Sequence, residues 1–286
     1  MRFRDHALRE TSLRPAALEG SSTAGADVEK TRNTIDGAAL SAAQFLSAKA
    51  SDPISLGDVA DHVGYSPSHL VRLFESVVGV PPGRYLAQLR FERAKTLLLT
   101  TGEPVRDICF EVGFTSLGTF TRRFAEGVGY SPGRFRVLPH ILADHPPRPL
   151  HLPTGLTSGG TISGVTVLSR AARDAVGPNP ALYVGLFTTP SAKGRPVTSS
   201  LLDGVDTFAF VNVPPGRFWV LASALPGAAE PLRQLVPLRS VYGRTMRPIL
   251  VGRDAPHHHV AIELEPAEEW QLPVLLAVPA LASAGT

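Results

Sequence analysis

An internal repeat is the feature that most constrains how this chain can fold. The string FESVVGVPPGRY, from Phe74 to Tyr85, returns fifty positions later as FAEGVGYSPGRF, from Phe124 to Phe135. Upstream, with one residue inserted, VADHVGYS from Val59 matches ICFEVGFT from Ile108. Self-similarity of this kind predicts two copies of one small supersecondary unit.

Each copy has the residue order of a helix-turn-helix. A first short helix is expected to end at Gly64 or Gly113, because glycine adopts the left-handed conformation at little steric cost. Ser66 in the first copy, and Ser116 or Thr115 in the second, are expected to cap a second helix through a side-chain oxygen.

Helix packing follows from the same pattern. Ala60 and Cys109 are small where the two helices of a copy cross, and a buried face is predicted for Leu70, Phe74, Phe120 and Phe124. One long helix, from about Pro82 to Leu99, is expected to join the copies. Two such units would present two recognition helices to successive major-groove segments about 34 Å apart.

With this repeat, the segment 36–138 resembles the DNA-binding domain of the AraC/XylS family of transcription regulators. The resemblance implies an all-α unit of seven helices that binds double-stranded DNA at an operator or promoter, with RNA polymerase as a further partner. It is carried by Ala60, Gly64 to Ser66, Leu70 to Phe74, Arg90 to Leu98, Ile108, Gly113 and Phe114, Phe120 to Phe124, Pro132 and Arg136.

The resemblance also implies which side chains read the bases. In the family, the exposed side of each second helix contacts base edges. Carried over by position, the base contacts are Ser68, His69, Val71 and Arg72 in the first copy and Leu117, Gly118, Thr119, Thr121 and Arg122 in the second.

The two copies differ in the chemistry of these positions. Arg72 and Arg122 occupy the same repeat position, where arginine can bind guanine through two hydrogen bonds or clamp a phosphate. Leu117 and Gly118 stand where the family often has polar residues, so the second copy is expected to depend more on DNA shape and phosphate contacts. Candidate phosphate contacts are Ser66, Arg84, Arg90, Arg93, Ser116, Arg134 and Arg136.

Composition divides the chain into four parts. Residues 1–35 are small and polar without apolar periodicity, which predicts a disordered or weakly ordered arm. Five prolines between Pro139 and Pro153 predict an extended linker. Beyond it, 154–286 is expected to form an all-β sandwich, making the chain a multidomain protein. The expected strands are Thr161–Leu168, Leu182–Phe187, Thr207–Val213, Arg217–Ala224, His258–Leu264 and Leu272–Val278.

Within the second domain, Pro215-Gly216 predicts a type II turn between two strands. The segment around it resembles the hairpin of transthyretin-like or carboxypeptidase-regulatory-like β-sandwiches. Two roles stay open for this domain: sensing a small-molecule effector, or an architectural role in self-association, as in a homodimer, or in contact with other proteins.

Charge and motif content argue against other function classes. Residues 36–140 hold 11 basic and 10 acidic residues, a net charge of only +1, so DNA binding must rest on where charges lie. The lone Cys109 aligns with Ala60, which predicts packing and no redox role. His257 and His259 are expected on one strand face without further ligands, so neither a metal nor another cofactor is predicted.

No catalytic motif is present, so no enzyme is predicted. The absence of an apolar leader or membrane-length segment favours the cytoplasm, with no membrane partner. The leading hypothesis is therefore a sequence-specific transcription regulator modulated by its C-terminal domain. The alternative is a ligand- or protein-binding β-sandwich that the helix-turn-helix unit delivers to DNA.

Overall fold

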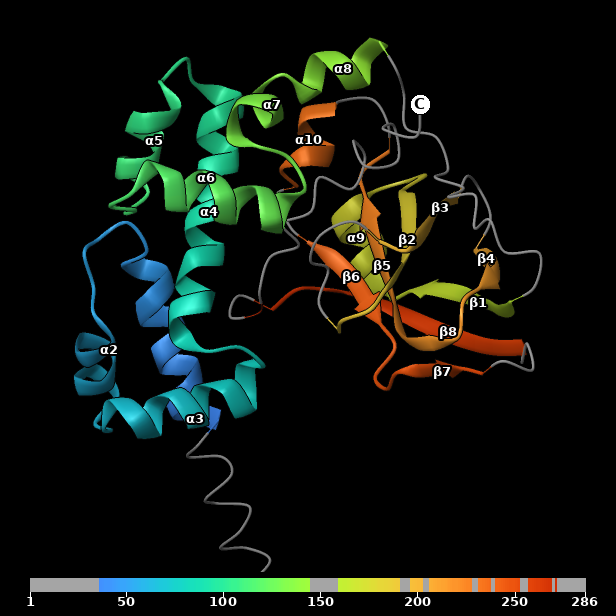
Figure 1. Cartoon of the computed structure of the whole chain (residues 1–286), viewed down its shortest axis with the longest axis horizontal. Helices are drawn as coiled ribbons and strands as arrows, with labels where there is room; N and C mark the ends of the chain where they lie inside the picture. The colour runs from blue at the N-terminus through green and yellow to red at the C-terminus, as the bar shows by residue number, and fades with distance from the viewer. Residues whose placement is uncertain are drawn as a thin grey trace, which may run out of the picture.

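A helical part is followed by a β-rich part in the computed structural model of the chain (Figure 1). The described residues are 36–144, 159–190, 196–202, 206–227, 231–237, 240–252, 257–268 and Gln271. The expected arm over 1–35, the linker beyond Asp144 and the expected strand Leu272–Val278 lie outside them.

Seven helices occupy residues 36–137, as the resemblance implied. We call residues 36–81 module 1 and residues 101–137 module 2, with one long helix between them. The helices are 36–48, α2 (Leu56–Val63), α3 (Pro67–Val78), α4 (Pro82–Thr100), α5 (Val105–Glu111), α6 (Leu117–Val128) and α7 (Pro132–Arg136). An eighth, α8 (Leu138–Asp144), extends into the expected linker at 139–153, because proline is tolerated in the first turn, where Pro139 lies.

The turns have the conformations expected from the repeat. Gly64 and Gly113 adopt φ values of 73° and 92°, in the left-handed region. The Ser66 hydroxyl accepts a hydrogen bond from the His69 amide at 3.4 Å, and Ser116 accepts from Thr119 at 3.3 Å. Both capping serines and both glycine turns are therefore confirmed.

Helix α4 contributes to two separate hydrophobic cores. Its first turn places Tyr85 in the core of module 1, beside Phe74 at a ring-centroid distance of 5.3 Å. Its second half places Phe91, Ala94 and Leu98 in the core of module 2. Since one helix carries part of both cores, it sets the distance between the modules.

Aromatic rings fill the core of module 2. Phe91 stacks on Phe114 at 5.1 Å and meets Phe120 and Phe124 at 6.0 and 5.7 Å. Phe124 meets Phe135 of α7 edge-on at 5.8 Å. Such ring pairs stabilise by about 0.5–1.5 kcal/mol each beyond the burial of their area. They hold α4, α6 and α7 together.

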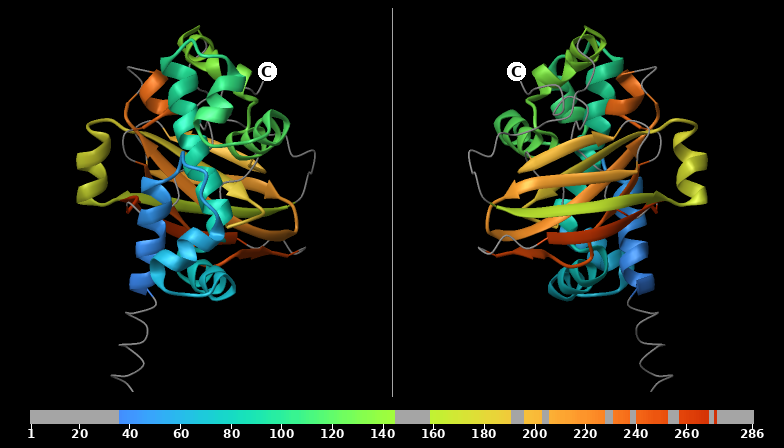
Figure 2. Two further views of the ribbon diagram at one scale, coloured as in Figure 1. Left: turned by 90° about the vertical axis from the view of Figure 1, so that its left-hand side faces the viewer. Right: turned by 90° about the vertical axis from the view of Figure 1, so that its right-hand side faces the viewer.

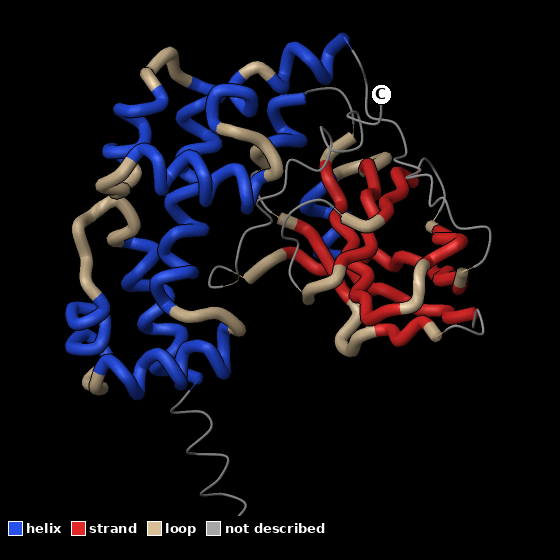
Figure 3. Tube along the Cα trace, in the orientation of Figure 1, coloured by secondary structure: helices blue, strands red, loops and turns tan. Residues whose placement is uncertain are grey.

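The β-rich part is one sheet that nearly closes on itself. Its strand order is β3-β2-β5-β6-β8-β1-β4, with β7 paired to β5, and β3 and β4 approach each other at the ends (Figure 3). The expected two-layer sandwich is not confirmed. The strands are β1 (Gly160–Leu168), β2 (Ala181–Phe187), β3 (Thr198–Leu202), β4 (Thr207–Val213), β5 (Gly216–Leu225), β6 (Val241–Arg244), β7 (Ile249–Val251) and β8 (His257–Pro266).

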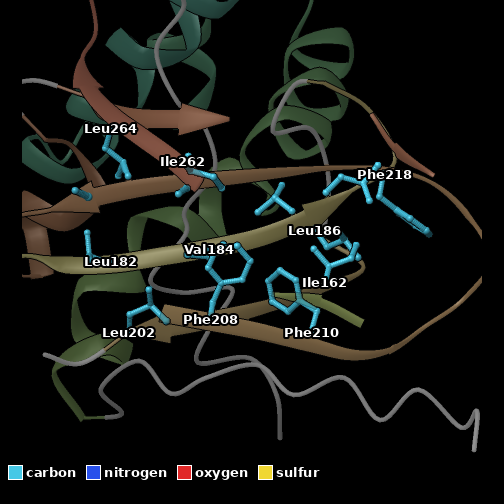
Figure 4. Packing of buried hydrophobic residues seen from close by; sticks show 14 of the residues in the cluster. Ile162, Leu182, Val184, Leu186, Leu202, Phe208, Phe210, Phe218, Ile262 and Leu264 are labelled. Carbon is cyan, nitrogen blue, oxygen red and sulfur yellow. The ribbon is translucent and has the colours of Figure 1, made fainter. Parts of the chain in front are cut away.

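Two short helices accompany the sheet. One of them, α9 (Arg170–Val176), connects β1 to β2 and packs Ala172 and Val176 into the sheet core. The other, α10 (Pro231–Leu235), lies beside α8 of the helical part (Figure 1). Inside the sheet, alternate side chains such as Ile162, Val184, Phe208 and Ile262 pack together (Figure 4).

The prediction of a hairpin at Pro215-Gly216 is wrong. Strand β4 pairs with β1 and β5 with β2, β6 and β7, so the two consecutive strands do not pair with each other. Gly216 lacks a positive φ, and Asn212 adopts one, 57°, where the β1–β4 register shifts at a bulge. Asparagine tolerates this left-handed conformation at the bulge, and the chain then bends at Pro215 before Gly216 begins β5.

The two parts share a hydrophobic contact. Phe187 of β2 is 6% exposed and Leu235 of α10 is 1% exposed, and both belong to the same buried cluster as the core of module 2. Leu221 and Val236 pack against that cluster. Figure 2 shows the sheet behind the helical part when viewed from the helical side. The β-rich part is thus docked on module 2.

In the part of the chain that the structure describes, no helix is both long and apolar enough to cross a bilayer.

The left-handed turn of module 1 gives a direct stability prediction. Gly64→Ala should lower the free energy of unfolding by about 1–2 kcal/mol, because alanine at φ 73° is strained although no atom lies within 4 Å of its Cβ. Urea unfolding followed by circular dichroism measures the loss. The control is Gly83→Ala, which adds a methyl group into equally open space in the first turn of α4 and should leave stability unchanged or slightly raised. Equal effects of the two substitutions would contradict the strain argument.

Candidate nucleic-acid interface

Helix α3 has one apolar and one polar face. Its inward side buries Leu70, Leu73 and Phe74. Ser68, His69 and Arg72 are exposed on the other side, and Val71 is half-buried between the faces. The predicted reading residues of module 1 therefore share a solvent-facing surface at the start of the helix.

Helix α6 repeats this arrangement. Phe120, Phe124 and Val128 are buried. Leu117, Gly118, Thr119 and Arg122 are exposed, and Thr121 is half-buried. Leu117 is 38% exposed. It can contact a thymine methyl group but cannot form a hydrogen bond.

The two helices are arranged alike relative to α4. They run in nearly the same direction, α3 across the start of α4 and α6 across its middle, where Phe91 meets Phe120 and Phe124 (Figure 1). Helix α4 has 19 residues, which corresponds to a length of about 28 Å at about 1.5 Å per residue. Successive major-groove segments on one side of B-DNA lie about 34 Å apart, which is the spacing that two reading helices must match.

The equivalent arginines differ in their neighbours. Arg122 Nη1 lies 3.1 Å from Glu126 Oε1, an exposed ion pair one helical turn apart. Arg72 forms no ion pair with any described residue, and the repeat has Ser76 where module 2 has Glu126. Arg72 is therefore available to a ligand, whereas Arg122 must first leave a carboxylate.

The predicted phosphate contacts fall into two groups. Arg84 and Arg134 occupy the same repeat position and are exposed at the starts of α4 and α7. Arg93 is exposed and lies 3.5 Å from Glu111 Oε1. Ser66 and Ser116 accept amide protons as caps, which leaves each hydroxyl proton available for a phosphate oxygen. These groups are thus accessible to solvent, as a phosphate contact requires.

Arg90 and Arg136 are held within the protein. Arg90 donates to the carbonyls of Ala50 and Asp52 at 2.7 and 2.9 Å, and burial lowers the pKa of its guanidinium. Arg136 donates to the carbonyl of Leu98 at 3.2 Å and to that of Glu103. These bonds give both arginines a structural role, which the sequence prediction of phosphate contacts did not foresee.

Some features of this surface could not be anticipated from the repeat. The Tyr65 ring meets the His69 ring edge-on at 4.8 Å and so restrains a predicted reading residue. Lys95 is 1% exposed in α4 and pairs with Glu92 Oε2 at 3.0 Å. Tyr65 and His69 are four residues apart, a spacing that brings side chains together on one helix. Tyr65 lies before the N-cap Ser66, however, so the predicted start of α3 did not include it.

The histidine cluster of the β-rich part has the predicted alternation. His257 Nε2 and His259 Nδ1 lie 2.8 and 3.2 Å from Ser163 Oγ, and both side chains are exposed on one face of β8. His258 lies on the other face. Among the described residues, no group of three or more histidine, cysteine or acidic side chains is placed to hold a metal ion.

Comparison with known proteins identifies the helical part. Residues 59–137 match the family model described as "Helix-turn-helix domain". The chain is 39% identical over 84 residues to the HTH-type transcriptional activator AarP of Providencia stuartii, covering 29% of this chain and 62% of the relative. It is 35% identical over 95 residues to the right origin-binding protein of Escherichia coli, covering 33% of each. The chain thus spans less than two thirds of these relatives' lengths.

A solved structure also matches part of the chain. A transcriptional regulator from Chromobacterium violaceum, whose title names AraC-type DNA-binding domain-containing proteins, is 28% identical with a TM-score of 0.34, covering 40% of this chain and 95% of that one. The family match and the curated relatives confirm an AraC/XylS-type helix-turn-helix unit over residues 59–137.

Cys109 provides a test of its packing role. It is fully buried, and burial raises the pKa of its thiol, so little thiolate is present or accessible at neutral pH. In the folded protein it should react with a thiol reagent such as DTNB about 100-fold or more slowly than in the urea-unfolded chain, because reaction requires the helix pair to open. Absorbance at pH 8 measures both rates. Comparable rates in the two states would overturn the packing role and reopen a redox role.

Proposed function

We propose that this chain is a transcription regulator that binds double-stranded DNA sequence-specifically, with α3 and α6 in two successive major-groove segments. The observation that carries the proposal is the duplicated exposed surface. In it, Arg72 and Arg122 occupy equivalent positions on α3 and α6, two helices that both pack against α4. The names of the curated relatives, a transcriptional activator and an origin-binding protein, support DNA as the partner.

The two modules contribute unequally in this proposal. Module 1 reads bases with Ser68, His69 and the unpaired Arg72, and the half-buried Val71 contacts a thymine methyl group or packs against the groove wall. Module 2 offers Thr119, Thr121 and Arg122 for hydrogen bonds, with Leu117 and Gly118 restricted to apolar contact and close approach. Arg84, Arg93, Arg134 and the two capping serines hold the phosphates.

Substitution of the two arginines tests this assignment. Arg72→Ala and Arg122→Ala should each weaken specific binding by about 1–3 kcal/mol and relax specificity at one base pair, because each removes a base contact. Affinity measured by gel shift on an operator and on base-substituted variants gives both quantities. The larger loss is expected for Arg72→Ala, since Arg122 must give up its ion pair with Glu126 on binding.

Glu126→Ser is the matched variant for this experiment, because it gives module 2 the residue that module 1 has at Ser76. It should strengthen binding by releasing Arg122 and removing a negative charge near the phosphates. The assignment of Arg122 would be wrong if Glu126→Ser left affinity unchanged while Arg122→Ala also had no effect.

The β-rich part is proposed to modulate module 2. Phe187 and Leu235 are buried in the same cluster as Phe120 and Phe124 of the reading helix, so a shift of β2 or α10 must repack α6 or α8. A small-molecule effector or self-association of the β-rich part would provide the input. In the alternative function, the β-rich part is a ligand- or protein-binding unit that module 1 and module 2 only deliver to DNA, without such coupling.

Leu235→Ala separates modulation from delivery. The cavity should cost about 2–5 kcal/mol at the contact and speed amide exchange in α6 and α8, with no change in α3. Hydrogen exchange of the full chain, read by mass spectrometry, reports each helix separately. Leu232→Ala in the same helix is the control, because Leu232 is 42% exposed. Unchanged exchange in α6 and α8 would favour delivery.

A further inference from the structure

One side chain touches both modules. Arg90 lies in α4, and its Nε and Nη2 donate to the carbonyls of Ala50 and Asp52, at 2.7 and 2.9 Å. Those carbonyls belong to the loop between the first helix and α2, so this contact fixes the entry into the helix-turn-helix of module 1.

The same guanidinium also lies against the turn of module 2. Its Cζ is 5.7 Å from the centroid of the Phe114 ring. A Cβ at Gly113 would come within 2.9 Å of the Cζ, Nε and Nη2 atoms of Arg90, so only glycine leaves room for it there. Gly113 and Phe114 form the turn between α5 and α6 and lead directly into the second reading helix.

The helices α2 and α3 of module 1 are joined to α5 and α6 of module 2 mainly through α4. Their hydrophobic cores are separate clusters, and each takes its own residues from α4. In the described part of the chain, neither α2 nor α3 packs closely against α5 or α6. A single helix fixes the distance between two bodies along its axis, but it resists bending and twisting between them less well than a cross-brace does.

We propose that Arg90 is a positioning residue that sets the spacing and rotational phase of the two reading helices, and therefore the half-site spacing of the operator. The consequence for DNA rests on the proposed function, whereas the bracing of the modules does not. The planar fork of arginine suits this role, because it bonds two carbonyls while its guanidinium lies over the Phe114 ring.

Arg136 provides a matched control within the same chain. It also donates two bonds to carbonyls, those of Leu98 in the last turn of α4 and Glu103 in the loop that follows, and both lie beside module 2, the module to which Arg136 itself belongs. Loss of Arg136 removes a bond pair of the same kind and lowers stability without releasing one module from the other.

The first experiment measures the bracing without DNA. Spin labels are attached at the equivalent exposed positions Ser76→Cys in α3 and Glu126→Cys in α6 of the full chain, with Cys109→Ala, the residue that module 1 has at Ala60. Pulsed electron resonance should give one narrow distance distribution for the parent and for Arg136→Ala, and a broadened or shifted distribution for Arg90→Ala. An unchanged distribution in Arg90→Ala would overturn the proposal.

Folding of each variant is checked by circular dichroism. If Arg90→Ala does not fold, Arg90→Lys carries the test, because lysine keeps the charge but cannot bond both carbonyls and stack on Phe114 together. It too should broaden the distribution, and a parent-like distribution in Arg90→Lys would then overturn the proposal.

The second experiment extends the result to DNA. Operators are compared in which one or two base pairs are inserted between the half-sites, each of which rotates the second half-site by about 35°. The parent should lose about tenfold or more in affinity per insertion, and Arg90→Ala should lose less while keeping its salt dependence. A uniform loss at every spacing, with a salt slope lower by about one, would identify Arg90 as a phosphate contact instead.

The two experiments separate the possible failures. Absence of any sequence preference in the parent would contradict the proposed function and leave the distance measurement to decide the bracing. A narrow distribution in Arg90→Ala, together with specific binding by the parent, would contradict the bracing alone.

Discussion

The shared helix α4 is the constraint on which the rest of the helical part depends. Tyr85 near its start completes the core of module 1, and Phe91, Ala94 and Leu98 complete the core of module 2. Neither module could bury its apolar face without this helix, so both are attached to one rigid element. The positions of α3 and α6 follow, and with them the separation of the two exposed surfaces that carry Arg72 and Arg122. The docking of Phe187 and Leu235 then attaches the β-rich part to one end of the same frame.

The helical part could be predicted almost completely from the sequence, because its signals are local and occur twice. Gly64 and Gly113, the capping serines and the apolar spacing each specify a conformation within a few residues.

The β-rich part was predicted less well. Five expected strands are present, but β3, β6 and β7 have three to five residues each and too little alternation to stand out. The Pro215-Gly216 turn was misread because strand pairing depends on partners far along the chain, and a turn motif does not identify those partners.

The candidate site was predictable to the level of the helix face. Exposure of Ser68, His69, Arg72, Leu117, Gly118, Thr119 and Arg122 agrees with the positions carried over from the family resemblance. The arginines of α4 and α7 could not be sorted in the same way. An arginine that bonds backbone carbonyls, as Arg90 and Arg136 do, and an arginine that faces solvent, as Arg84 does, look alike in a helical pattern, because the carbonyls come from residues about 35 to 40 positions away. The ion pair between Arg122 and Glu126 distinguishes Arg122 from Arg72, and the structure is what shows that this pair forms.

Selection of bound sequences from a random pool of duplex DNA by the purified full chain tests the central claim most directly. The account predicts two enriched blocks whose centres lie about 10 base pairs apart on one face of the duplex, the block read by module 1 being the better defined. A single block, two blocks without fixed spacing, or no enrichment at all would contradict it.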